Sequence, residues 1–435
     1  MKSTPSVAVV GGGLAGLVAA RHLAAAGADV TVLERRDEVG GRVRTTVRDG
    51  YQFDRGFQVL FTAYPAVKRE LDLEELDLRP FAPGAVVARP DGRAVLGDPL
   101  RDPTALPSTL TTRAVSVGDR LRVLELLGRL RRTRFDEIFD GSDATIEASL
   151  RREGFSERFL ENFARPFYGG ITLDRSLSTS KRVFEYTFKA LAEGEIAVPA
   201  GGMGAIPDHL ATRARTAGAT IELGAEVADV SGDGGSGDGR RSATVDLEGG
   251  RAIEVDAVVV ATDPRRASDL TGLESAPTAA RSCTTQYLSL SDGGGRSLET
   301  GRRLVLNATG VGPNHVVAMS EVAPEYAPAG ETLLSATYTG IPDASDERLA
   351  ERTRRALESW FPERSFHRLG HLRTDRIAFA QFAQPPGIHE RLPRVRALAS
   401  AGPIYLAGDY TRWSSIQGAL ESGRRAARAV VEDLR

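Results

Sequence analysis

Cysteine is nearly absent from this chain of 435 residues, in which Cys283 is the single example. One cysteine excludes an internal disulfide framework and a metal or iron–sulfur site built from several thiolates. It is also consistent with a reducing compartment. Lysine is scarce as well and occurs only at Lys2, Lys68, Lys181 and Lys189, so that arginine supplies the other basic residues. We interpret this bias as the usage of a high-GC genome and not as a functional feature.

Long hydrophobic runs are lacking too. No stretch approaches the roughly 20 apolar residues of a membrane span, and the first apolar run, 7–10, is too short for a secretory signal. A net charge of −2 gives no reason to expect nucleic acid as a partner. The length predicts two or three domain-sized units. We therefore expect a cytoplasmic globular enzyme that holds no metal.

The clearest motif lies at the N-terminus, in "SVAVVGGGLAGLVAARHLAAAGADVTVLERR". The pattern predicts a buried strand over 7–10, a helix over 14–26 and a second strand over 29–33. Gly11, Gly13 and Gly16 form G-x-G-x-x-G between the first strand and the helix. In a βαβ dinucleotide fold these glycines permit a tight turn, the approach of a diphosphate, and close packing of helix on strand. The helix N-terminus, with Leu14 and Ala15, supplies N–H groups to the phosphates.

An acid follows at the expected place. Glu34 ends the second strand, 18 residues after Gly16, where a carboxylate can hold ribose hydroxyls. A glycine turn without a ligand is the alternative interpretation. Strand, helix and acid in register favour a bound dinucleotide, but the motif alone does not separate NAD from FAD.

The next residues, "ERRDEVGGRVRT", combine glycine and arginine. Gly40 and Gly41 permit a second close backbone approach, and Arg42 can place positive charge near a diphosphate with support from Arg35 and Arg36. A plain Gly-Gly loop with solvated arginines is the alternative.

This segment resembles the E-x-R-x-x-x-G-G-R run of the flavin-containing amine oxidase and phytoene desaturase superfamily. The following "GYQFDRGFQVL" resembles the D-x-G segment of that family, at Asp54 and Gly56, which passes beside the flavin ring. The resemblance implies FAD as the cofactor and adds Gly56, Phe57 and Gln58 to its site. It also implies an α/β fold, namely a Rossmann-type (GR2-like) FAD-binding domain with an interleaved α+β substrate domain.

The middle of the chain returns to the same architecture in "AVPAGGMGAIPDHLATRARTAGATIELGAEVADV", where we expect a helix ending near 217 and a strand over 220–223. The resemblance implies that the backbone of Val227 contacts adenine, and an α/β unit without a ligand is the alternative. A flexible hairpin loop is expected over 231–242. The strand expected in "AVVVATDP" ends at Ala261 and Thr262, another feature of the family. We assign residues 1–80, 198–275 and 400–435 to the FAD-binding domain, and 81–197 and 276–399 to the substrate-binding domain.

"IYLAGDYTRWSSIQGALESG" near the C-terminus reads as a strand, a Gly-Asp turn, a polar loop and a helix that starts near Ser415 or Ile416. Gly408 lets the backbone approach the cofactor, and Asp409 is placed to accept a hydrogen bond from a ribitol or phosphate-proximal group. The positive helix N-terminus suits the N1–C2=O edge of a flavin. "YLAGDYT" resembles the desaturases, whereas "RWSS" resembles the amine oxidases.

Two departures from the family narrow the reaction. Its amine oxidases place a lysine near flavin N5, but the matching region, "SCTTQYLSL", has none. Its monoamine oxidases attach the flavin through a C-terminal cysteine that this chain lacks, so FAD should be non-covalent. A second nicotinamide fingerprint is also missing, which disfavours an NADPH-dependent monooxygenase.

The resemblance therefore implies hydride transfer from an apolar small molecule to flavin N5, with quinone or O2 as the electron acceptor. We expect an activity like that of the carotenoid or isoprenoid desaturases, or a redox isomerase. A protoporphyrinogen-type oxidase and a flavin amine oxidase without the usual lysine remain alternatives. A protein that holds FAD mainly to bind a partner is a third.

Several side chains are candidates near the ring. Gln384 lies in "FAQFAQPPG", which resembles the loop beside the active site of the desaturases, and His315 is either a base or a structural residue. Trp413, Tyr410, Arg376 and Gln58 complete this group. The aromatic residues of 163–188 form either a core or the wall of an apolar cavity.

The segment 118–135 predicts a basic amphipathic helix. Its leucines recur at helical spacing and its arginines outnumber its acids. Two interpretations stay open: a membrane-surface helix at the mouth of a tunnel for a lipid substrate, with peripheral membrane contact, and a surface helix packed on the substrate domain.

Overall fold

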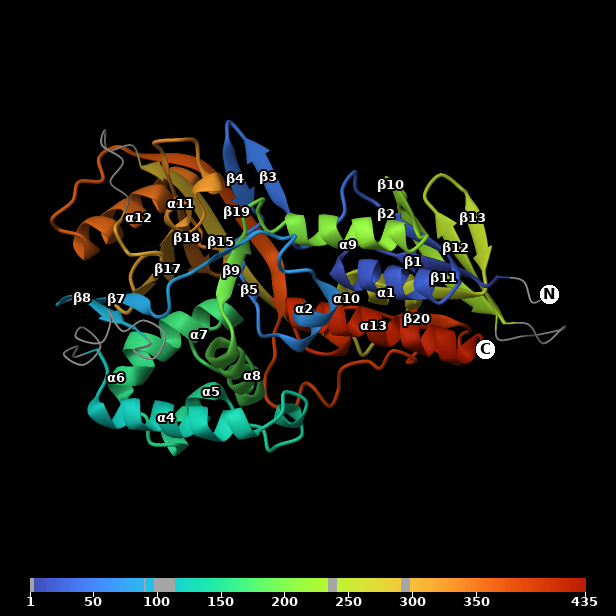
Figure 1. Ribbon diagram of the computed structural model, residues 1–435, viewed down its shortest axis with the longest axis horizontal. Helices are drawn as coiled ribbons and strands as arrows, with labels where there is room; N and C mark the ends of the chain where they lie inside the picture. Colours follow the sequence, from blue (N-terminus) through green and yellow to red (C-terminus); the bar gives the residue numbers. More distant parts are fainter. Residues whose placement is uncertain (1–3, 90, 98–113, 234–240, 291–297) are drawn as a thin grey trace.

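The computed structural model describes residues 4–89, 91–97, 114–233, 241–290 and 298–435. Figure 1 shows an elongated molecule in which a parallel sheet and its helices form the end that carries both termini. A larger, mainly antiparallel sheet and a group of helices form the other end. The predicted α/β class with an interleaved α+β part is confirmed.

The parallel sheet has five strands in the order β10-β2-β1-β14-β20. Distant parts of the sequence supply them, and every neighbouring pair is parallel. The carboxyl ends of these strands therefore meet at one edge, where α/β sheets bind their ligands. The strands are β1 (Ser6–Val10), β2 (Asp29–Glu34), β10 (Thr220–Leu223), β14 (Ala257–Val260) and β20 (Ile404–Leu406).

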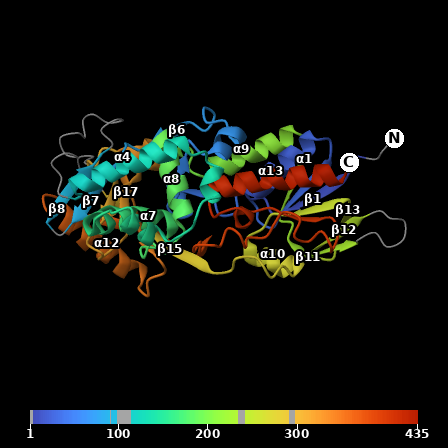
Figure 2. The same ribbon diagram turned by 90° about the horizontal axis from the view of Figure 1, so that it is seen from below.

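Both faces of this sheet are covered (Figure 2). Val7 and Val9 pack toward the helices on one face, whereas Ala8 and Val10 pack toward a three-stranded antiparallel sheet and one helix on the other. This division follows from the alternation of side chains along a strand. The first face carries α1 (Leu14–Ala25), α9 (Ala205–Thr216) and α13 (Ile416–Asp433), and the second carries α10 (Pro264–Thr271), β11 (Val227–Asp233), β12 (Ser242–Leu247) and β13 (Ala252–Val255).

Helices α1 and α13 approach each other closely, which brings the two ends of the chain together. A Cβ atom on Gly423 would lie 2.2 Å from the carbonyl oxygen of Ala15, so only glycine fits at this crossing. The C-terminal helix is thereby held beside the helix that follows the N-terminal glycine turn.

The larger sheet has seven strands in the order β19-β15-β18-β17-β16-β7-β8, and its β16–β7 pair is parallel. One face packs on α12 (Asp346–Trp360) through Leu357 and Trp360. The other face carries residues such as Cys283 and Thr337 toward a cavity. The strands are β7 (Ala85–Arg89), β8 (Gly92–Leu96), β15 (Ala280–Leu290), β16 (Leu304–Asn307), β17 (His315–Ala318), β18 (Thr332–Thr339) and β19 (Leu369–Phe382).

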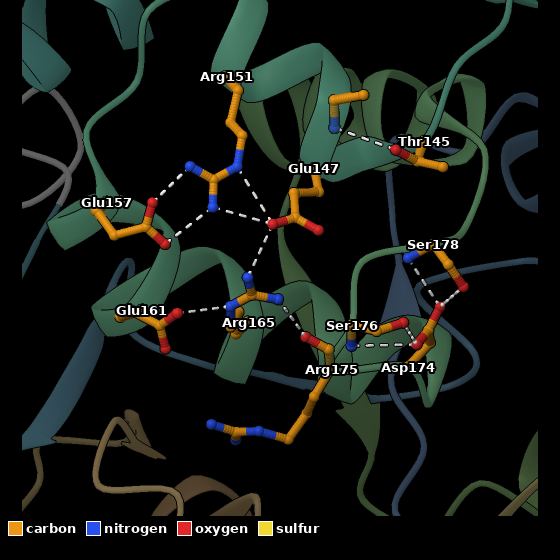
Figure 3. A network of polar contacts seen from close by, with 11 residues as sticks. Thr145, Glu147, Arg151, Glu157, Glu161, Arg165, Asp174, Arg175, Ser176 and Ser178 are labelled. Carbon is orange, nitrogen blue, oxygen red and sulfur yellow. Dashed lines mark hydrogen bonds and ion pairs between the residues drawn. The ribbon is translucent and has the colours of Figure 1, made fainter.

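A helical group lies beside this sheet: α4 (Val117–Arg132), α5 (Ile146–Arg152), α6 (Glu157–Phe159), α7 (Arg165–Thr172) and α8 (Lys181–Glu193). Ion pairs link α5, α6 and α7, with Arg151 and Arg165 sharing Glu147 (Figure 3). Such partly exposed pairs each contribute little to stability.

Smaller elements connect the two ends of the molecule. They are the hairpin β3 (Thr45–Arg48) and β4 (Tyr51–Asp54), the short strands β5 (Leu60–Phe61), β6 (Leu78–Pro80) and β9 (Ile196–Pro199), helices α2 (Pro65–Glu70) and α11 (Met319–Val322), and 3₁₀ turns at Glu137–Phe139, Pro324–Tyr326 and Asp409–Thr411.

The predicted elements of the dinucleotide fold agree with these bounds to within one or two residues. The helix expected from the 201–204 glycines begins only at Ala205, because these glycines form the turn that precedes it. In the predicted loop over 231–242, β11 and β12 form the two sides of a hairpin, and 234–240 lie outside the described residues.

Helix α4 has features of both a membrane-surface helix and a helix packed on the substrate domain, the two interpretations of segment 118–135. Leu126 and Leu130 are buried against the helical group. Leu121 and Leu124 are 58% and 55% exposed, and Val117 on the same side is also exposed. Among the described residues, no helix has the length and apolar character needed to cross a membrane.

Candidate functional site

A cavity of about 730 Å³ lies between the carboxyl edge of the parallel sheet and one face of the seven-stranded sheet. Its wall includes the turn after β1, the end of β2, the N-terminus of α13, strands β15 to β19, and α7. Elements that are far apart in sequence therefore meet around one space.

Most of the predicted site residues line this cavity. Those at its wall are Gly11, Gly13, Leu14, Ala15, Glu34, Arg35, Arg36, Gly41, Arg42, Gly56, Phe57, Gln58, Val227, His315, Arg376, Gln384, Gly408, Asp409, Trp413, Ser415 and Ile416. Gly16 and Tyr410 lie behind the wall. The structure thus brings the N-terminal and C-terminal motifs together.

The three N-terminal glycines have three different surroundings. Gly11 has φ +109°, and a Cβ there would lie 2.9 Å from the carbonyl oxygen of Ala261. A Cβ on Gly16 would lie 2.0 Å from the carbonyl oxygen of Gly11. Helix α1 can therefore pack against the glycine turn only if residue 16 has no side chain. A Cβ on Gly13 would meet nothing within 4 Å, although the residue lines the cavity. This open space beside a helix N-terminus suits a diphosphate.

Glu34 is buried at the end of β2 and already holds the glycine turn in place. Its Oε2 accepts a hydrogen bond from the N–H of Gly12 at 2.7 Å, and its Oε1 accepts one from the N–H of Arg36 at 3.1 Å. Because each carboxylate oxygen can accept more than one hydrogen bond, the carboxylate retains capacity for ligand hydroxyls.

Arg42 and Asp409 form an ion pair across the cavity wall. Nη2 of Arg42 lies 2.7 Å from Oδ1 of Asp409, whose side chain is only 4% exposed. Burial lowers the pKa of Arg42, but the charge and contact of Asp409 outweigh it and raise the pKa. Oδ2 of Asp409 accepts a hydrogen bond from Oγ of Ser414 at 2.9 Å. Oδ1 already contacts the guanidinium of Arg42, but a carboxylate oxygen can accept more than one hydrogen bond, so it keeps capacity for a ligand hydroxyl.

The C-terminal helix begins at Ile416, as the sequence predicts. Its N-cap is Ser415, whose Oγ accepts a hydrogen bond from the N–H of Gly418 at 2.8 Å. Both Ser415 and Ile416 line the cavity. The positive end of the α13 dipole is therefore directed at the cavity.

Tyr410 serves packing and does not line the cavity. Its ring lies against Gly408, where a Cβ would come within 2.3 Å of it. The side chain is fully buried, and its hydroxyl donates to the carbonyl of Val260 at 3.4 Å. The catalytic role expected for Tyr410 is therefore withdrawn, because this hydroxyl points into the core behind β14.

Gln384 and Trp413 stand together at the cavity wall. Oε1 of Gln384 accepts a hydrogen bond from the N–H of Ser414 at 2.9 Å, which ties the loop after β19 to the C-terminal loop. Trp413 packs against Tyr64 and Tyr186, with ring centroids 5.9 and 4.9 Å apart. Both side chains shape the wall, and neither carries an ionisable group for proton transfer.

His315 is buried at the start of β17 and also lines the cavity. Burial, with a smaller contribution from the charge of Arg175, lowers the pKa of His315 to about 4. The imidazole is therefore neutral near pH 7.

The loop of Gly56, Phe57 and Gln58 lies against the seven-stranded sheet. A Cβ on Gly56 would come within 2.8 Å of Cδ1 of Ile377, so the loop needs glycine to pack this closely. Nε2 of Gln58 donates to the carbonyls of Arg42 and Arg55 and so joins two cavity-lining segments.

Sequence reasoning missed several arginines. Nη2 of Arg266 donates to the carbonyl of Val227 at 2.6 Å, so the predicted adenine contact sits beside a guanidinium. Arg55 and Arg265 also line the cavity. Arg266 lies two residues after the "ATDP" segment, in the first turn of the helix that follows β14. Its closeness to the carboxyl end of a parallel strand could have identified it as a site residue. Arg55 is the middle residue of the D-x-G segment, so its position in that motif could have marked it.

The aromatic residues of 163–188 are mostly core. Of the six that the sequence suggested, Phe167 lines the cavity, whereas Tyr168, Phe184 and Tyr186 are buried among other side chains. No lysine among the described residues lines the cavity. Within the same residues, no group of three or more His, Cys, Asp or Glu side chains is arranged to hold a metal ion.

Asp54 lies behind the cavity wall and joins three elements. Its Oδ1 accepts hydrogen bonds from Oγ1 of Thr45 and from the N–H of Met203, and its Oδ2 accepts one from the hydroxyl of Tyr326. Burial raises the pKa of Asp54 to about 6, although these hydrogen bonds act in the opposite direction. Asp54 thus holds the turn before α9 rather than the cavity surface.

We expect Asp54→Asn to change how stability depends on pH. In the unfolded chain the pKa of an aspartate is about 4, so the raised folded pKa of about 6 stabilises the protein below about pH 4, and this contribution is lost as pH rises through 6. Between about pH 4 and 7 the wild type should lose up to about 3 kcal/mol relative to Asp54→Asn. Urea unfolding of both proteins at several pH values measures this difference, and a difference independent of pH would contradict it.

The residues around the cavity fit FAD. The space at Gly13 suits a diphosphate, the α13 N-terminus suits the electron-rich edge of a flavin, and Oδ1 of Asp409 is a buried acceptor for a ribityl hydroxyl. The parallel sheet with its glycine turn, closed by a second sheet, defines a two-part dinucleotide-binding protein.

Comparison with known proteins gives the family. The profile described as "Flavin containing amine oxidoreductase" matches residues 14–431. The chain belongs to this family, which confirms the resemblance seen in the N-terminal and C-terminal motifs.

Individual relatives differ in their reported activities. The chain is 32% identical to a phytoene dehydrogenase of Streptomyces griseus over 288 residues, which cover 59% of the chain and 54% of that protein. It is 28% identical to protoporphyrinogen oxidase 2 of Arabidopsis thaliana over 38% of the chain and 32% of that protein. These matches span about half or less of each relative. The crystal structure of an oxidoreductase from Methanosarcina mazei has the same fold, with a TM-score of 0.70 at 18% identity, over 97% of this chain and 100% of that one.

Proposed function

We propose that this chain is an FAD-dependent oxidoreductase that oxidises an apolar small molecule in a reaction like that of the carotenoid and isoprenoid desaturases. One observation carries the proposal: a single cavity extends from the N-terminal glycine turn to the face of the antiparallel sheet. The likeness to a phytoene dehydrogenase supports the same class of substrate.

The residues at the parallel-sheet edge would hold the cofactor non-covalently. We assign the diphosphate to the turn of Gly11 and Gly13 with Arg42, the adenosine ribose to Glu34, and the ribityl chain to Asp409. When bound, the flavin would supply the hydride acceptor at N5. Residues 1–80, 198–275 and 400–435 would form this part, and the remainder would bind the substrate.

The opposite wall would orient the substrate and exclude water. Its apolar members include Phe57, Phe167, Ile171, Leu306 and Ile377, and most of them lie on the antiparallel sheet or α7. Gln384 and Trp413 would fix the shape of the wall where it meets the cofactor part. His315 is neutral, so Arg376 is the one charged side chain among the catalytic candidates named above. Its charge is paired with that of Asp346.

A protoporphyrinogen-type oxidase is the second candidate, because Arg55 lines the cavity and makes no ion pair among the described residues. Burial, followed by the charges of Arg44 and Arg36, lowers the pKa of Arg55. An anionic group such as a propionate would relieve this repulsion between cations.

Anaerobic bleaching of the flavin distinguishes these functions. Purified protein should be yellow and release FAD on acid or heat treatment. A polyene precursor should bleach the flavin in the first case, a porphyrinogen in the second, and an amine in neither. Colourless protein that fails to bind added FAD would contradict the whole proposal, and bleaching by amines alone would contradict the desaturase assignment. Re-oxidation with a quinone or with O2 then identifies the electron acceptor.

Peripheral membrane contact through α4 stays a prediction. The exposed Leu121 and Leu124 lie among arginines such as Arg131 and Arg132, a combination that suits an anionic bilayer surface. The protein should float with anionic vesicles, and Leu121→Glu with Leu124→Glu should abolish flotation. Equal recovery of wild type and variant, or no flotation of either, would contradict membrane contact.

A further inference from the structure

A chain of three polar side chains leads from the helical group to the cavity wall. Arg165, which belongs to the ion pairs of α5, α6 and α7, donates to the carbonyl of Arg175 at 3.0 Å (Figure 3). Nη1 of Arg175 reaches Oδ1 of Asn314 at 2.7 Å, and both terminal nitrogens donate to the carbonyl of Asn307. Arg175 therefore interacts with neutral acceptors.

These contacts determine the orientation of the Asn314 amide. A guanidinium has only donors, so the amide oxygen must face Arg175. The amide nitrogen then faces the carbonyl of Pro166, to which it donates at 2.9 Å. Both contacts agree with one orientation and exclude the flipped amide.

The amide orientation in turn determines the proton on His315. Nδ2 of Asn314 lies 3.1 Å from Nδ1 of His315. An amide NH2 group cannot accept a hydrogen bond, so Nδ1 must be the acceptor and the single proton of the neutral ring must be on Nε2. Protonation of Nδ1 would bring two donors face to face, which adds to the effect of burial on the pKa of this ring.

The Nε2–H group of His315 has no partner among the residues that the structure describes. Nε2 is buried and has no hydrogen bond within the described part of the chain, although the ring lines the cavity. The ring of Phe57 contacts the imidazole with centroids 4.8 Å apart and offers no conventional acceptor atom. A buried donor without an acceptor is costly, so an acceptor atom of a bound molecule would stabilise this wall.

We propose that His315 is a fixed hydrogen-bond donor for the substrate, and that the substrate is an apolar molecule with an oxygen acceptor at the end that reaches this wall. Arg175 and Asn314 are positioning residues that set the tautomer. This inference rests on the proposed function and narrows its substrate class from hydrocarbons to oxygen-bearing isoprenoids or similar molecules. It also replaces the role of base considered for His315, because its proton-accepting nitrogen is occupied by Asn314.

The tautomer can be measured without cofactor or substrate. Long-range ¹H–¹⁵N NMR of the full chain should show His315 with Nε2 protonated and Nδ1 unprotonated, without change from about pH 6 to 8. Asn314→Asp should reverse the tautomer, because a carboxylate accepts from Nδ1–H, and should bring the titration of the ring into this range. Asn162→Asp, the same change at an amide that donates to the carbonyl of Ala114, is the matched control. Protonated Nδ1 in the wild type would overturn the proposal even if Asn314→Asp fails to fold.

Paired ligands test the substrate class. We compare squalene with the same hydrocarbon carrying a hydroxyl group at one end. The FAD-bound protein should bind the alcohol about tenfold or more tightly, because its oxygen accepts the hydrogen bond of the buried donor. The flavin absorbance follows binding of both ligands. His315→Phe should remove this preference, because the variant has no donor for the alcohol oxygen. Equal binding of both ligands by the wild type, or an unchanged preference in His315→Phe, would overturn the proposal. Failure of both ligands to bind would contradict the proposed function, whereas the NMR result decides the donor assignment separately.

Discussion

Gly16→Ala should destabilise the protein and weaken FAD binding together, whereas Gly13→Ala should weaken FAD binding in a protein that remains folded. The added methyl at position 16 would lie 2.0 Å from the backbone oxygen of Gly11, so α1 or the glycine turn must move. We expect a loss of about 3 kcal/mol or more in the free energy of unfolding. The methyl at position 13 would meet no atom of the described residues within 4 Å, and Gly13 lines the cavity where we place the diphosphate.

The two variants separate folding from cofactor binding. For Gly13→Ala we expect a change of about 1 kcal/mol or less in stability, because Ala replaces Gly at a helix N-cap. FAD affinity should fall about 10- to 100-fold, since one misplaced methyl costs about 1–3 kcal/mol. Urea unfolding of the cofactor-free proteins and titration with FAD measure both quantities. Gly128→Ala in α4, also without a neighbour within 4 Å, is the control and should retain FAD. Wild-type affinity in Gly13→Ala would remove the diphosphate from this turn.

The second large effect is expected at the Arg42–Asp409 pair. Arg42→Ala leaves the 4% exposed carboxylate of Asp409 without its cation. Removing one partner of a fully buried pair costs about 3–5 kcal/mol, and because Arg42 is 34% exposed we expect a loss at the low end of this range. FAD retention should also fall, because Arg42 and Asp409 both line the cofactor end of the cavity.

The partner substitution provides the matched comparison. Asp409→Asn keeps the shape and an acceptor for Ser414, and it leaves Arg42, which is 34% exposed, within reach of water. It should therefore cost less stability than Arg42→Ala. The double variant should be more stable than Arg42→Ala alone, because no buried charge remains. Urea unfolding of the four proteins tests this order, and a double variant less stable than Arg42→Ala would show that the pair does not govern stability here.

The first βαβ unit was predictable because its information is local. The apolar run Val7–Val10, the helix after Gly13 and the acid Glu34 lie within one short segment, and each element forms for reasons that its own residues carry. The helix start at Ile416 was predictable for the same reason, since Ser415 is a good N-cap.

The role of individual side chains was less predictable. Tyr410 stands next to Asp409 in sequence, yet one is buried behind the wall and the other lines the cavity. The D-x-G segment suggested a position beside the flavin, but the carboxylate of Asp54 instead binds the turn before α9 and Tyr326. Neither outcome follows from spacing, because a turn can direct neighbouring side chains to opposite sides.

The sequence by itself determined the class of fold, the family and the two segments that meet at the cavity. Only the tertiary structure decided that Arg42 pairs with Asp409 and that Arg55 and Arg266 line the cavity. It also placed Asn314 beside Nδ1 of His315, which sets the tautomer of that ring. The physical reason is the range of the interactions. Helix propensity, glycine conformation and hydrophobic alternation act within a few residues, whereas an ion pair or a histidine tautomer depends on partners that folding brings from other parts of the chain.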